Sequence, residues 1–408
     1  MRIAVCVSVF PPRYESFVVN QVRGLIESGH QVQVFARRRG DSQHLLRNGE
    51  ANLFTARTHY RPQIPTRPFP RRLKAIATAA CFGWRAPSLL WQASRSGTGL
   101  WYDAIPFLDH RSFDIIHCQH GNIGRTVAGL IDCGFLEGRL LTAFRGSDLA
   151  RVQARPDDYR LLFDIAERIL PVSESLARQL TQLGCPAERL QVHRSGIDIE
   201  NLDRFRHRSL VKSSTNCRLI SVGRLVAKKG HDVLLEAVAR LDGDVELEII
   251  GDGPLRDSLD AQARQLGLTD RVTFSGWQPH DTVLTRIADA DVLVNASQTA
   301  ADGTQEGIPN VIKEAMALGT PVVATDHAGT PELIDDRLTG YLVPEADATR
   351  LATVLQEVID SPAIDPALRA AARQRVLDEY NSSRLNRELL DLFESLVDPL
   401  PHASQSRP

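Results

Sequence analysis

The feature that most constrains the fold is an alternation of short apolar segments with helical patterns, which runs through the chain twice. In the first half the apolar segments span residues 2–9, 31–36, 114–118, 139–144 and 168–172, with a weaker one at 190–193. In the second half they span residues 218–222, 245–251, 271–275, 291–295, 321–324 and 340–343. The helical patterns between them include residues 17–28, 174–183, 231–241, 255–266, 281–288 and 311–318. This alternation predicts an α/β protein with two doubly wound parallel sheets.

The length of 408 residues also indicates two domains, since it exceeds one ordinary hydrophobic core. The polar stretch 199–216 is the predicted linker, and we place the domains at residues 1–208 and 209–382. The helix expected over 383–400 is predicted to pack back on the first domain. Parallel sheets bind ligands beyond the carboxyl ends of their strands, so two facing sheets predict one cleft between the domains.

Composition narrows the class of protein. A hydrophobic content of 43% with 24% charged residues is typical of a globular protein. The six cysteines include no C-x-x-C pair, which argues against zinc and a disulfide framework and predicts a reducing, cytoplasmic location. No apolar stretch reaches the 18 residues that suggest a membrane span.

Charge is distributed unevenly along the chain. Residues 1–100 carry 15 Lys and Arg against 4 Asp and Glu, whereas residues 213–408 carry 18 against 31. Within the basic part, residues 68–91 mix cations with Phe, Trp and Leu, as interfacial helices do. Two interpretations stay open, contact with an anionic membrane surface or a solvated basic face over a local core. No nucleic-acid partner is expected.

A turn between two carboxylates is the strongest candidate site. Residues 305–321 read Q-E-G-I-P-N-V-I-K-E-A-M-A-L-G-T-P, in which a helix is expected to follow the Gly-Ile-Pro-Asn turn and to end at Gly319. Glu306 then lies in the loop and Glu314 about one turn into the helix. The N–H groups at residues 308–311 would favour an anion. Such a site suits a sugar joined through phosphate to a nucleoside.

The loop after the first strand of the second half adds two cations. It reads S-V-G-R-L-V-A-K-K-G-H-D, where Gly223 and Gly230 allow tight turns beside Arg224 and Lys229. A guanidinium and an ammonium suit the charge of a diphosphate, although an ordinary basic surface loop is the alternative. The next loop, G-D-G-P, has residues that favour a tight turn, and it would form one wall of the same site.

These motifs together resemble those of a known family. V-G-R-L-x-x-x-K-G, G-D-G-P-L, E-G-I-P-N-V-x-x-E-A-M-A-x-G-x-P-V-V-A-T and G-x-P-E-L-I occur in that order over residues 217–345, as in the retaining nucleotide-sugar glycosyltransferases of family 4. In the first half, F-P-P-R-Y-E-S-F-V-V-N-Q, D-I-I-H-C-Q-H-G and T-A-F-R-G-S-D-L resemble the colanic acid and amylovoran branch of exopolysaccharide transferases. The resemblance implies the GT-B fold, with an N-terminal acceptor-binding domain and a C-terminal donor-binding domain.

The resemblance also implies roles for single residues. Arg224 and Lys229 would bind the donor diphosphate and its leaving charge, Glu306 the transferred sugar, and Glu314 the ribose. The full donor-binding set would be Gly223, Arg224, Lys229, Gly307, Ile308, Pro309, Asn310, Val311 and Glu314. Neither a metal nor a further cofactor would be needed, and no D-x-D cluster lies in a donor loop. Transfer of a hexose would retain the anomeric configuration, the departing phosphate taking the acceptor's proton.

The acceptor side departs from the family pattern. Where many relatives carry H-x-H, this chain has His117-Cys118-Gln119-His120, and where they carry F-H-G it has Arg145. His120 is the candidate for contact with the acceptor and for a catalytic role, with Arg145 and Glu15 as further acceptor-side candidates. His117, at a strand end, is interpreted as structural. Asp148 either caps its turn or orients Arg145, and we favour the cap.

The sequence therefore predicts a glycosyltransferase that moves a hexose from UDP-galactose or UDP-glucose, with GDP-mannose next, to a lipid-linked saccharide in bacterial exopolysaccharide synthesis. It would be cytoplasmic, or peripheral on the inner face of the membrane. A transferase with a soluble acceptor, and a donor-binding module without catalysis, are the alternatives. An NAD-binding oxidoreductase would need G-x-G-x-x-G after an early strand, where this chain has F-P-P-R-Y-E.

Overall fold

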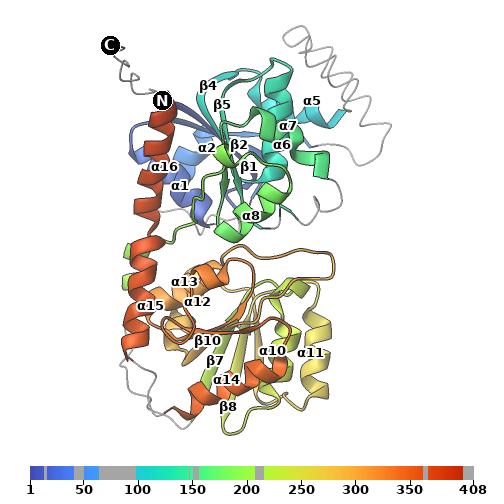
Figure 1. The fold of residues 1–408 in the computed structure, drawn as a ribbon, viewed down its shortest axis with the longest axis vertical. Helices are drawn as coiled ribbons and strands as arrows, with labels where there is room; N and C mark the ends of the chain where they lie inside the picture. Colours follow the sequence, from blue (N-terminus) through green and yellow to red (C-terminus); the bar gives the residue numbers. More distant parts are fainter. Residues whose placement is uncertain are drawn as a thin grey trace, which may run out of the picture.

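Two lobes, each built on one parallel sheet, make up the protein in a computed structural model (Figure 1). The structure describes residues 1–12, 16–40, 50–63, 98–146, 148–149, 156–206, 216–361 and 366–397. The first sheet contains β1 (Arg2–Phe10), β2 (Gln31–Arg39), β3 (Thr58–Tyr60), β4 (Ser112–Cys118), β5 (Glu137–Phe144) and β6 (Arg168–Pro171). The second contains β7 (Cys217–Val222), β8 (Val245–Ile250), β9 (Val272–Gly276), β10 (Val292–Asn295), β11 (Val322–Asp326) and β12 (Tyr341–Pro344).

Both sheets have the same strand order. The first runs β3-β2-β1-β4-β5-β6 and the second β12-β11-β10-β7-β8-β9. All strands are parallel, and the order in which the chain adds them reverses between β1 and β4 in the first sheet and between β7 and β10 in the second. In register, Ile3 of β1 pairs with Ile115 of β4, and Leu293 of β10 pairs with Ile220 of β7. Loops that leave the strands at such a reversal form the ligand crevice of doubly wound folds. The predicted pair of doubly wound sheets is confirmed.

Helices cover both faces of each sheet. In the first lobe these are α1 (Ser16–Glu27), α2 (Glu50–Arg57), α5 (Thr98–Ala104), α6 (Gly121–Asp132), α7 (Arg160–Ile165) and α8 (Glu174–Gln182). In the second they are α10 (His231–Val238), α11 (Arg256–Gln265), α12 (His280–Asp289), α13 (Asn310–Leu318) and α14 (Ala348–Asp360), together with α9 (Ile199–Asp203), which packs against α13. α15 (Pro366–Glu379) and α16 (Ser382–Val397) follow, and in Figure 1 they run one after the other along the side of both lobes.

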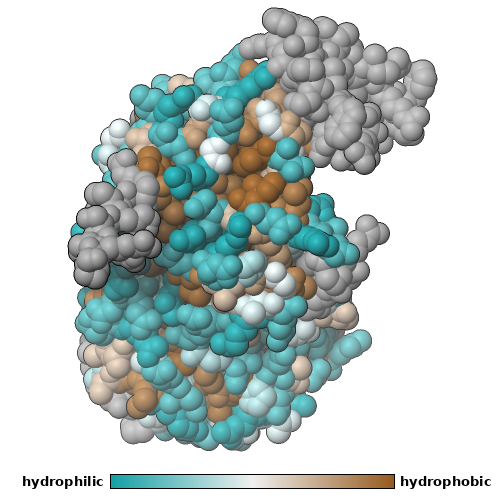
Figure 2. Space-filling model, turned by 45° about the horizontal axis from the view of Figure 1, so that its top comes forward, coloured by the Kyte–Doolittle hydropathy of each residue, from teal (hydrophilic) through white to brown (hydrophobic). Residues whose placement is uncertain are grey.

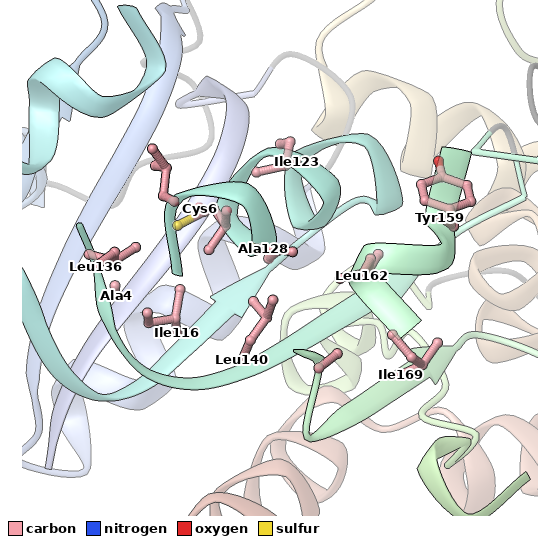
Figure 3. Close-up of a cluster of buried hydrophobic side chains, with 14 of the residues drawn as sticks. Ala4, Cys6, Ile116, Ile123, Ala128, Leu136, Leu140, Tyr159, Leu162 and Ile169 are labelled. Carbon is pink, nitrogen blue, oxygen red and sulfur yellow. The ribbon is translucent and has the colours of Figure 1, made fainter. Parts of the chain in front are cut away.

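The strands are apolar because both of their faces are buried. On one face of the first sheet, Ala4, Ile116, Leu140 and Ile169 belong to a continuous core with side chains from α6 and α7 (Figure 3). On the other face, Phe393 of α16 joins a core with β1 and α1. The helix α16 therefore packs on the first lobe, while α15 lies against α13 in the second.

Three details differ from the sequence prediction. Residues 190–193 form no strand, only an isolated bridge from Leu190 to Ile169, because β6 is short and ends at Pro171, which has no N–H for a ladder. The predicted linker begins with helix α9, capped by the Asp198 side chain, which accepts from the N–H of Asn201. The three-residue strand β3 was not predicted, since its sequence T-H-Y is too short to give a pattern.

Two predictions fall outside the described residues, namely Glu15 and the basic segment 68–91. Among the helices that the structure describes, none is long and apolar enough to cross a membrane. On the face drawn in Figure 2, hydrophilic residues cover most of the lower, C-terminal lobe, and hydrophobic residues gather in the upper lobe.

Candidate functional site

A cleft of about 420 Å³ lies where the two sheets face each other. Every described residue of the predicted site lines it: His120, Arg145, Gly223, Arg224, Lys229, Glu306, Gly307, Ile308, Pro309, Asn310, Val311 and Glu314. The loops after β7, β8 and β9 and the N-terminus of α13 supply the side that belongs to the second lobe. The loops after β4 and β5 supply the other side. The topology thus brings together groups that lie up to about 200 positions apart in the sequence.

The loop after β7 owes its shape to glycines at two close approaches. Gly230 has φ +60, and a Cβ there would lie 1.9 Å from the carbonyl oxygen of Ala296. A Cβ on Gly223 would come within 3.0 Å of the Lys229 side chain, which runs along this edge of the cleft. Arg224, on the same loop, is exposed and lines the cleft. Its position beside Lys229 gives the floor of the cleft a positive charge.

Glu306 is held between two ammonium groups. Its Oε1 lies 2.8 Å from Lys228 Nζ and its Oε2 2.9 Å from Lys229 Nζ. Burial acts to raise the pKa of Glu306, but the charges of Lys229 and Lys228 outweigh it and lower the pKa to about 2. The carboxylate is therefore ionised throughout the physiological range. Lys228 was not among the residues predicted from the sequence, where the K-K dipeptide was its one signal.

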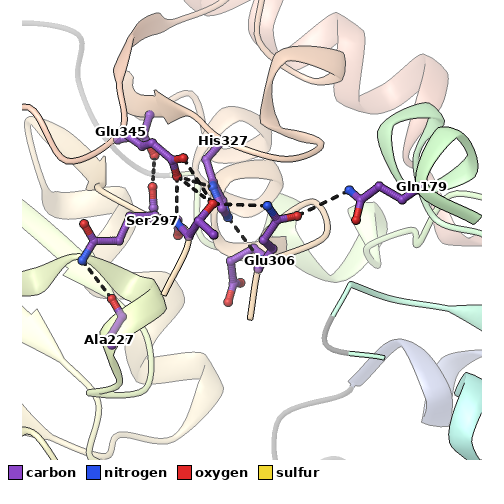
Figure 4. A network of polar contacts seen from close by, with 10 residues as sticks. Gln179, Ala227, Ser297, Glu306, His327 and Glu345 are labelled. Carbon is purple, nitrogen blue, oxygen red and sulfur yellow. Dashed lines mark hydrogen bonds and ion pairs between the residues drawn. The ribbon is translucent and has the colours of Figure 1, made fainter. Parts of the chain in front are cut away.

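A polar network fixes the backbone at Glu306 (Figure 4). The N–H of Glu306 donates to His327 Nε2 at 3.2 Å, and His327 Nδ1 lies 2.7 Å from Glu345 Oε2. Because Nε2 accepts, the proton of this buried imidazole is on Nδ1 and points at the Glu345 carboxylate. Gln305 contacts Gln179 of α8 at 3.4 Å. The network restrains the Glu306 loop from the second lobe and touches the first.

Helix α13 presents its N-terminus to the cleft. Pro309 is the N-cap residue and forms no side-chain hydrogen bond to the first turn. One correction applies to the predicted cradle, since Pro309 has no N–H and only Ile308, Asn310 and Val311 can donate. The partial positive charge of the helix N-terminus adds to the cations across the cleft.

Glu314, in the second turn of α13, has a partner that the sequence did not reveal. His280 Nε2, at the start of α12, lies 3.0 Å from Glu314 Oε1. Burial acts to lower the pKa of His280, but the Glu314 carboxylate outweighs it, so that the pKa of His280 is raised. Glu314 lines the cleft although the residue is only 8% exposed.

On the side of the cleft that the first lobe supplies, Arg145 is bound to other protein groups. Its guanidinium donates to the Gln119 carbonyl at 3.1 Å, to Gln119 Oε1 at 2.6 Å and to Ser195 Oγ at 2.5 Å. It also stacks on the Phe17 ring at 4.0 Å. Arg145 lines the cleft, but these bonds make it a brace between β4, β5 and the loop at Ser195 rather than a mobile cation.

The two histidines of the β4 end differ in environment. His117 is 1% exposed and packs against Phe393, as expected for a structural side chain. His120 lines the cleft, and its Nδ1 lies 3.6 Å from Asp148 Oδ1. The other oxygen of Asp148 accepts from the backbone N–H of Arg145 at 2.9 Å, so Asp148 closes this turn and also faces His120.

The lobes touch beside the cleft. Gly146 has φ +98, and a Cβ there would lie 2.8 Å from the backbone of Glu306. Lys313 of α13 is fully buried and donates to the Ser195 carbonyl at 2.7 Å, and burial lowers its pKa to about 7. Glu332 accepts from the N–H groups of Glu174 and Ser175 at 2.9 and 2.8 Å, which places a second-lobe carboxylate at the N-terminus of α8.

Comparison with known proteins identifies the family of the chain. Residues 14–201 match the family model described as Glycosyltransferase Family 4, and residues 203–375 match the model described as Glycosyl transferases group 1. WcaL of Salmonella typhimurium, named for colanic acid biosynthesis, is 33% identical, covering 97% of this chain and all of its own. The chain belongs to glycosyltransferase family 4.

Other proteins similar to this family 4 glycosyltransferase agree with the assignment. AmsK of Erwinia amylovora, an amylovoran biosynthesis glycosyltransferase, is 32% identical over 97% of this chain and the whole of that one. Among solved structures, Anabaena HepE in complex with UDP superposes with a TM-score of 0.70 at 17% identity, covering 97% of this chain and 100% of that one. The predicted family, its exopolysaccharide branch and the GT-B fold are confirmed, and the relatives support a role in polysaccharide biosynthesis.

Proposed function

We propose that this enzyme transfers a hexose from a UDP-sugar, with retention of configuration, to a lipid-linked saccharide. The observation that carries the proposal is the convergence of three cations, a helix N-terminus and two carboxylates on one cleft. Arg224, Lys228 and Lys229 come from one loop, and Glu306 and Glu314 flank the start of α13.

The diphosphate would lie between the cationic loop and the N-terminus of α13. Phosphate oxygens are favoured there because N–H groups and the helix dipole point at them. Arg224 offers a planar donor pair that suits a phosphate, and Lys229 offers a point charge. The same groups would stabilise the negative charge that develops on the leaving diphosphate as the glycosidic bond breaks.

The carboxylates would hold the two ends of the donor. Glu306 is ionised and can accept hydrogen bonds from hydroxyls of the sugar, while Glu314 can accept from the ribose. A double-displacement mechanism through either carboxylate is a poor fit, because Glu306 would be occupied by a sugar hydroxyl, and Glu314, which also contacts His280, by the ribose. We therefore propose attack from the face of the departing phosphate, which takes the acceptor's proton.

We also propose that no divalent cation is needed, because the lysines, the arginine and the helix N-terminus supply the positive charge. UDP is proposed as the nucleotide because HepE, which shares this fold, was crystallised in complex with UDP. The lipid-linked acceptor is proposed from the basic first hundred residues, which carry 15 Lys and Arg against 4 Asp and Glu, since such acceptors are anionic and lie at a membrane surface.

Thermal shift with UDP, GDP, UDP-glucose, UDP-galactose and GDP-mannose, each with and without EDTA, tests the donor. A ligand at 100 times its Kd stabilises the folded state by about 2.7 kcal/mol, so the true nucleotide will raise the melting temperature clearly. We expect UDP and one UDP-sugar to do so with EDTA present. Stabilisation by GDP-mannose alone, or only with a divalent cation, would contradict the respective part of the proposal.

A further inference from the structure

Two adjacent lysines grip the same carboxylate but are attached differently to the rest of the site. Lys228 Nζ reaches Glu306 Oε1 and also donates to the Gln305 carbonyl at 3.3 Å, so it holds the loop at two points. Lys229 Nζ is bound to Glu306 Oε2, and its methylenes lie along Gly223, on the edge that leads to Arg224. Both side chains are mostly buried, at 24% and 13% exposure.

This difference bears on what happens when a donor binds. The Glu306 carboxylate occupies the ammonium of Lys229 that a diphosphate would need. A diphosphate carries more negative charge than one carboxylate, so it can draw Lys229 away from Oε2 by rotation of side-chain bonds. Moving Lys228 to the phosphate would break two contacts, its ion pair with Glu306 and its hydrogen bond to the Gln305 carbonyl.

The backbone of Glu306 does not need to move during this exchange. Its N–H stays bound to His327, which Glu345 holds from behind. Once Lys229 has turned to the phosphate, Oε2 is open to accept a hydroxyl of the sugar, while Oε1 remains on Lys228. A single retained ion pair thus fixes the direction in which the open oxygen points.

We infer that Lys228 is the positioning residue that holds Glu306 on the sugar, while Lys229 is exchanged from Glu306 to the donor diphosphate. The inference rests on the proposed function, since it assumes that a nucleoside diphosphate sugar enters this cleft. It separates two lysines that the sequence presents as equivalent neighbours. It also gives Lys228 a specific effect on the sugar and not on the nucleotide.

In the part of the chain that the structure describes, few charged groups contact Glu306. They are Lys228 and Lys229 at its oxygens, and the His327–Glu345 pair at its backbone. With Lys229 on the diphosphate, Lys228 is the cation of this set that still opposes the effect of burial on the Glu306 carboxyl. Loss of Lys228 is therefore expected to raise the pKa of Glu306 in the donor complex and to shift the acid limb of kcat to higher pH.

The experiment compares Lys228→Met and Lys229→Met in the full-length protein, with Lys228→Arg as the conservative variant. Calorimetry measures binding of UDP and of the UDP-sugar that stabilises the wild type, and hydrolysis of that UDP-sugar gives kcat against pH. For Lys228→Met we expect UDP affinity within about 2-fold of wild type, loss of the extra affinity that the sugar provides, and kcat about 10²-fold lower. Lys229→Met should weaken UDP itself by about 10-fold or more. Lys228→Arg should return the acid limb toward its wild-type position.

The outcomes are distinguishable. If Lys228→Met weakens UDP as much as Lys229→Met and leaves the acid limb in place, both lysines are phosphate ligands and the inference is wrong. If Lys228→Met reduces kcat without either a shift of the acid limb or a change in sugar affinity, its role is only structural and the inference is equally wrong. If the wild type binds none of the nucleotides, the proposed function fails before the lysines are compared.

Discussion

The two lobes share a strand order but use the carboxyl ends of their strands differently. In the second lobe, Lys228, Lys229 and Glu306 form ion pairs at the cleft, and we infer that Lys229 can exchange Glu306 for a phosphate. In the first lobe, the guanidinium of Arg145 is hydrogen-bonded to Gln119 and Ser195. The same topology therefore supports a site for a charged ligand in one lobe and a braced wall in the other, which shows that the loops carry the chemistry.

The largest effect is expected on the donor side. Glu306→Ala removes the carboxylate that would hold the sugar and should lower transfer by about 10²–10³-fold, the range for loss of one preorganised polar group. Donor consumption measures the loss, and UDP should still bind, because Lys229 remains available to the phosphate. Glu236→Ala, an exposed glutamate of α10, is the control. Full activity in Glu306→Ala would contradict the proposal that Glu306 holds the sugar of the donor.

On the acceptor side the prediction concerns stability. Arg145→Ala leaves the carbonyl and amide oxygens of fully buried Gln119 without this donor, which should cost about 2 kcal/mol of unfolding free energy. Urea unfolding measures it, and affinity for UDP should stay unchanged. The control is Arg139→Ala on the same strand, whose exposed contact with Glu167 at 3.6 Å should matter little. Normal stability with lost UDP binding would mean that Arg145 is a ligand and not a brace.

A smaller effect is expected where the lobes meet. Glu332→Gln replaces the carboxylate at the N-terminus of α8 with a neutral amide and should lower kcat/KM by about 3-fold, since charge at a helix N-terminus contributes about 0.3–1 kcal/mol. Asp335→Asn, which alters a second-lobe contact with Arg375 in the same region, is the matched control. Equal kinetics for the two variants would show that the contact between lobes does not influence turnover.

The smallest effect is in the pH dependence of stability. Because the folded-state pKa of His280 is raised, its ion pair with Glu314 stabilises the fold below the usual histidine pKa of about 6.5 and this contribution is lost as pH rises through the folded value. The melting temperature of the wild type should exceed that of His280→Gln at about pH 6, and the difference should shrink at about pH 9. Glu314→Gln should abolish the same difference. Parallel pH profiles for the wild type and His280→Gln would contradict this.

Much of the fold was predictable because its signals are local. The strand at residues 218–222 and the helix at 311–318 are specified by runs of apolar residues and by Gly319, which ends the helix with φ +82. The motif residues Arg224, Lys229 and Glu306 could be selected because the glycines beside them mark turns at strand ends. The short strand β3 and helix α9 were missed because segments of a few residues have no periodicity.

The partners of these residues could not be predicted. Lys229 and Glu306 lie 77 positions apart, and His280 and Glu314 lie 34 apart, so their pairing depends on how strands of the sheet are ordered. Lys228 was not selected, because the K-K dipeptide does not indicate that its two side chains make separate contacts. The buried His327 gave no signal, since its role consists of one bond to a backbone N–H and one to Glu345.

By itself the sequence determined the two doubly wound lobes, their glycine turns and the residue types available for a nucleotide sugar, because backbone geometry and burial patterns act over a few neighbouring residues. Only the tertiary structure decided which charged side chains form ion pairs with one another. Ion pairs and hydrogen bonds require atoms within about 3 Å of one another, and for residues far apart in the chain that distance is set by the packing of the sheets and lobes.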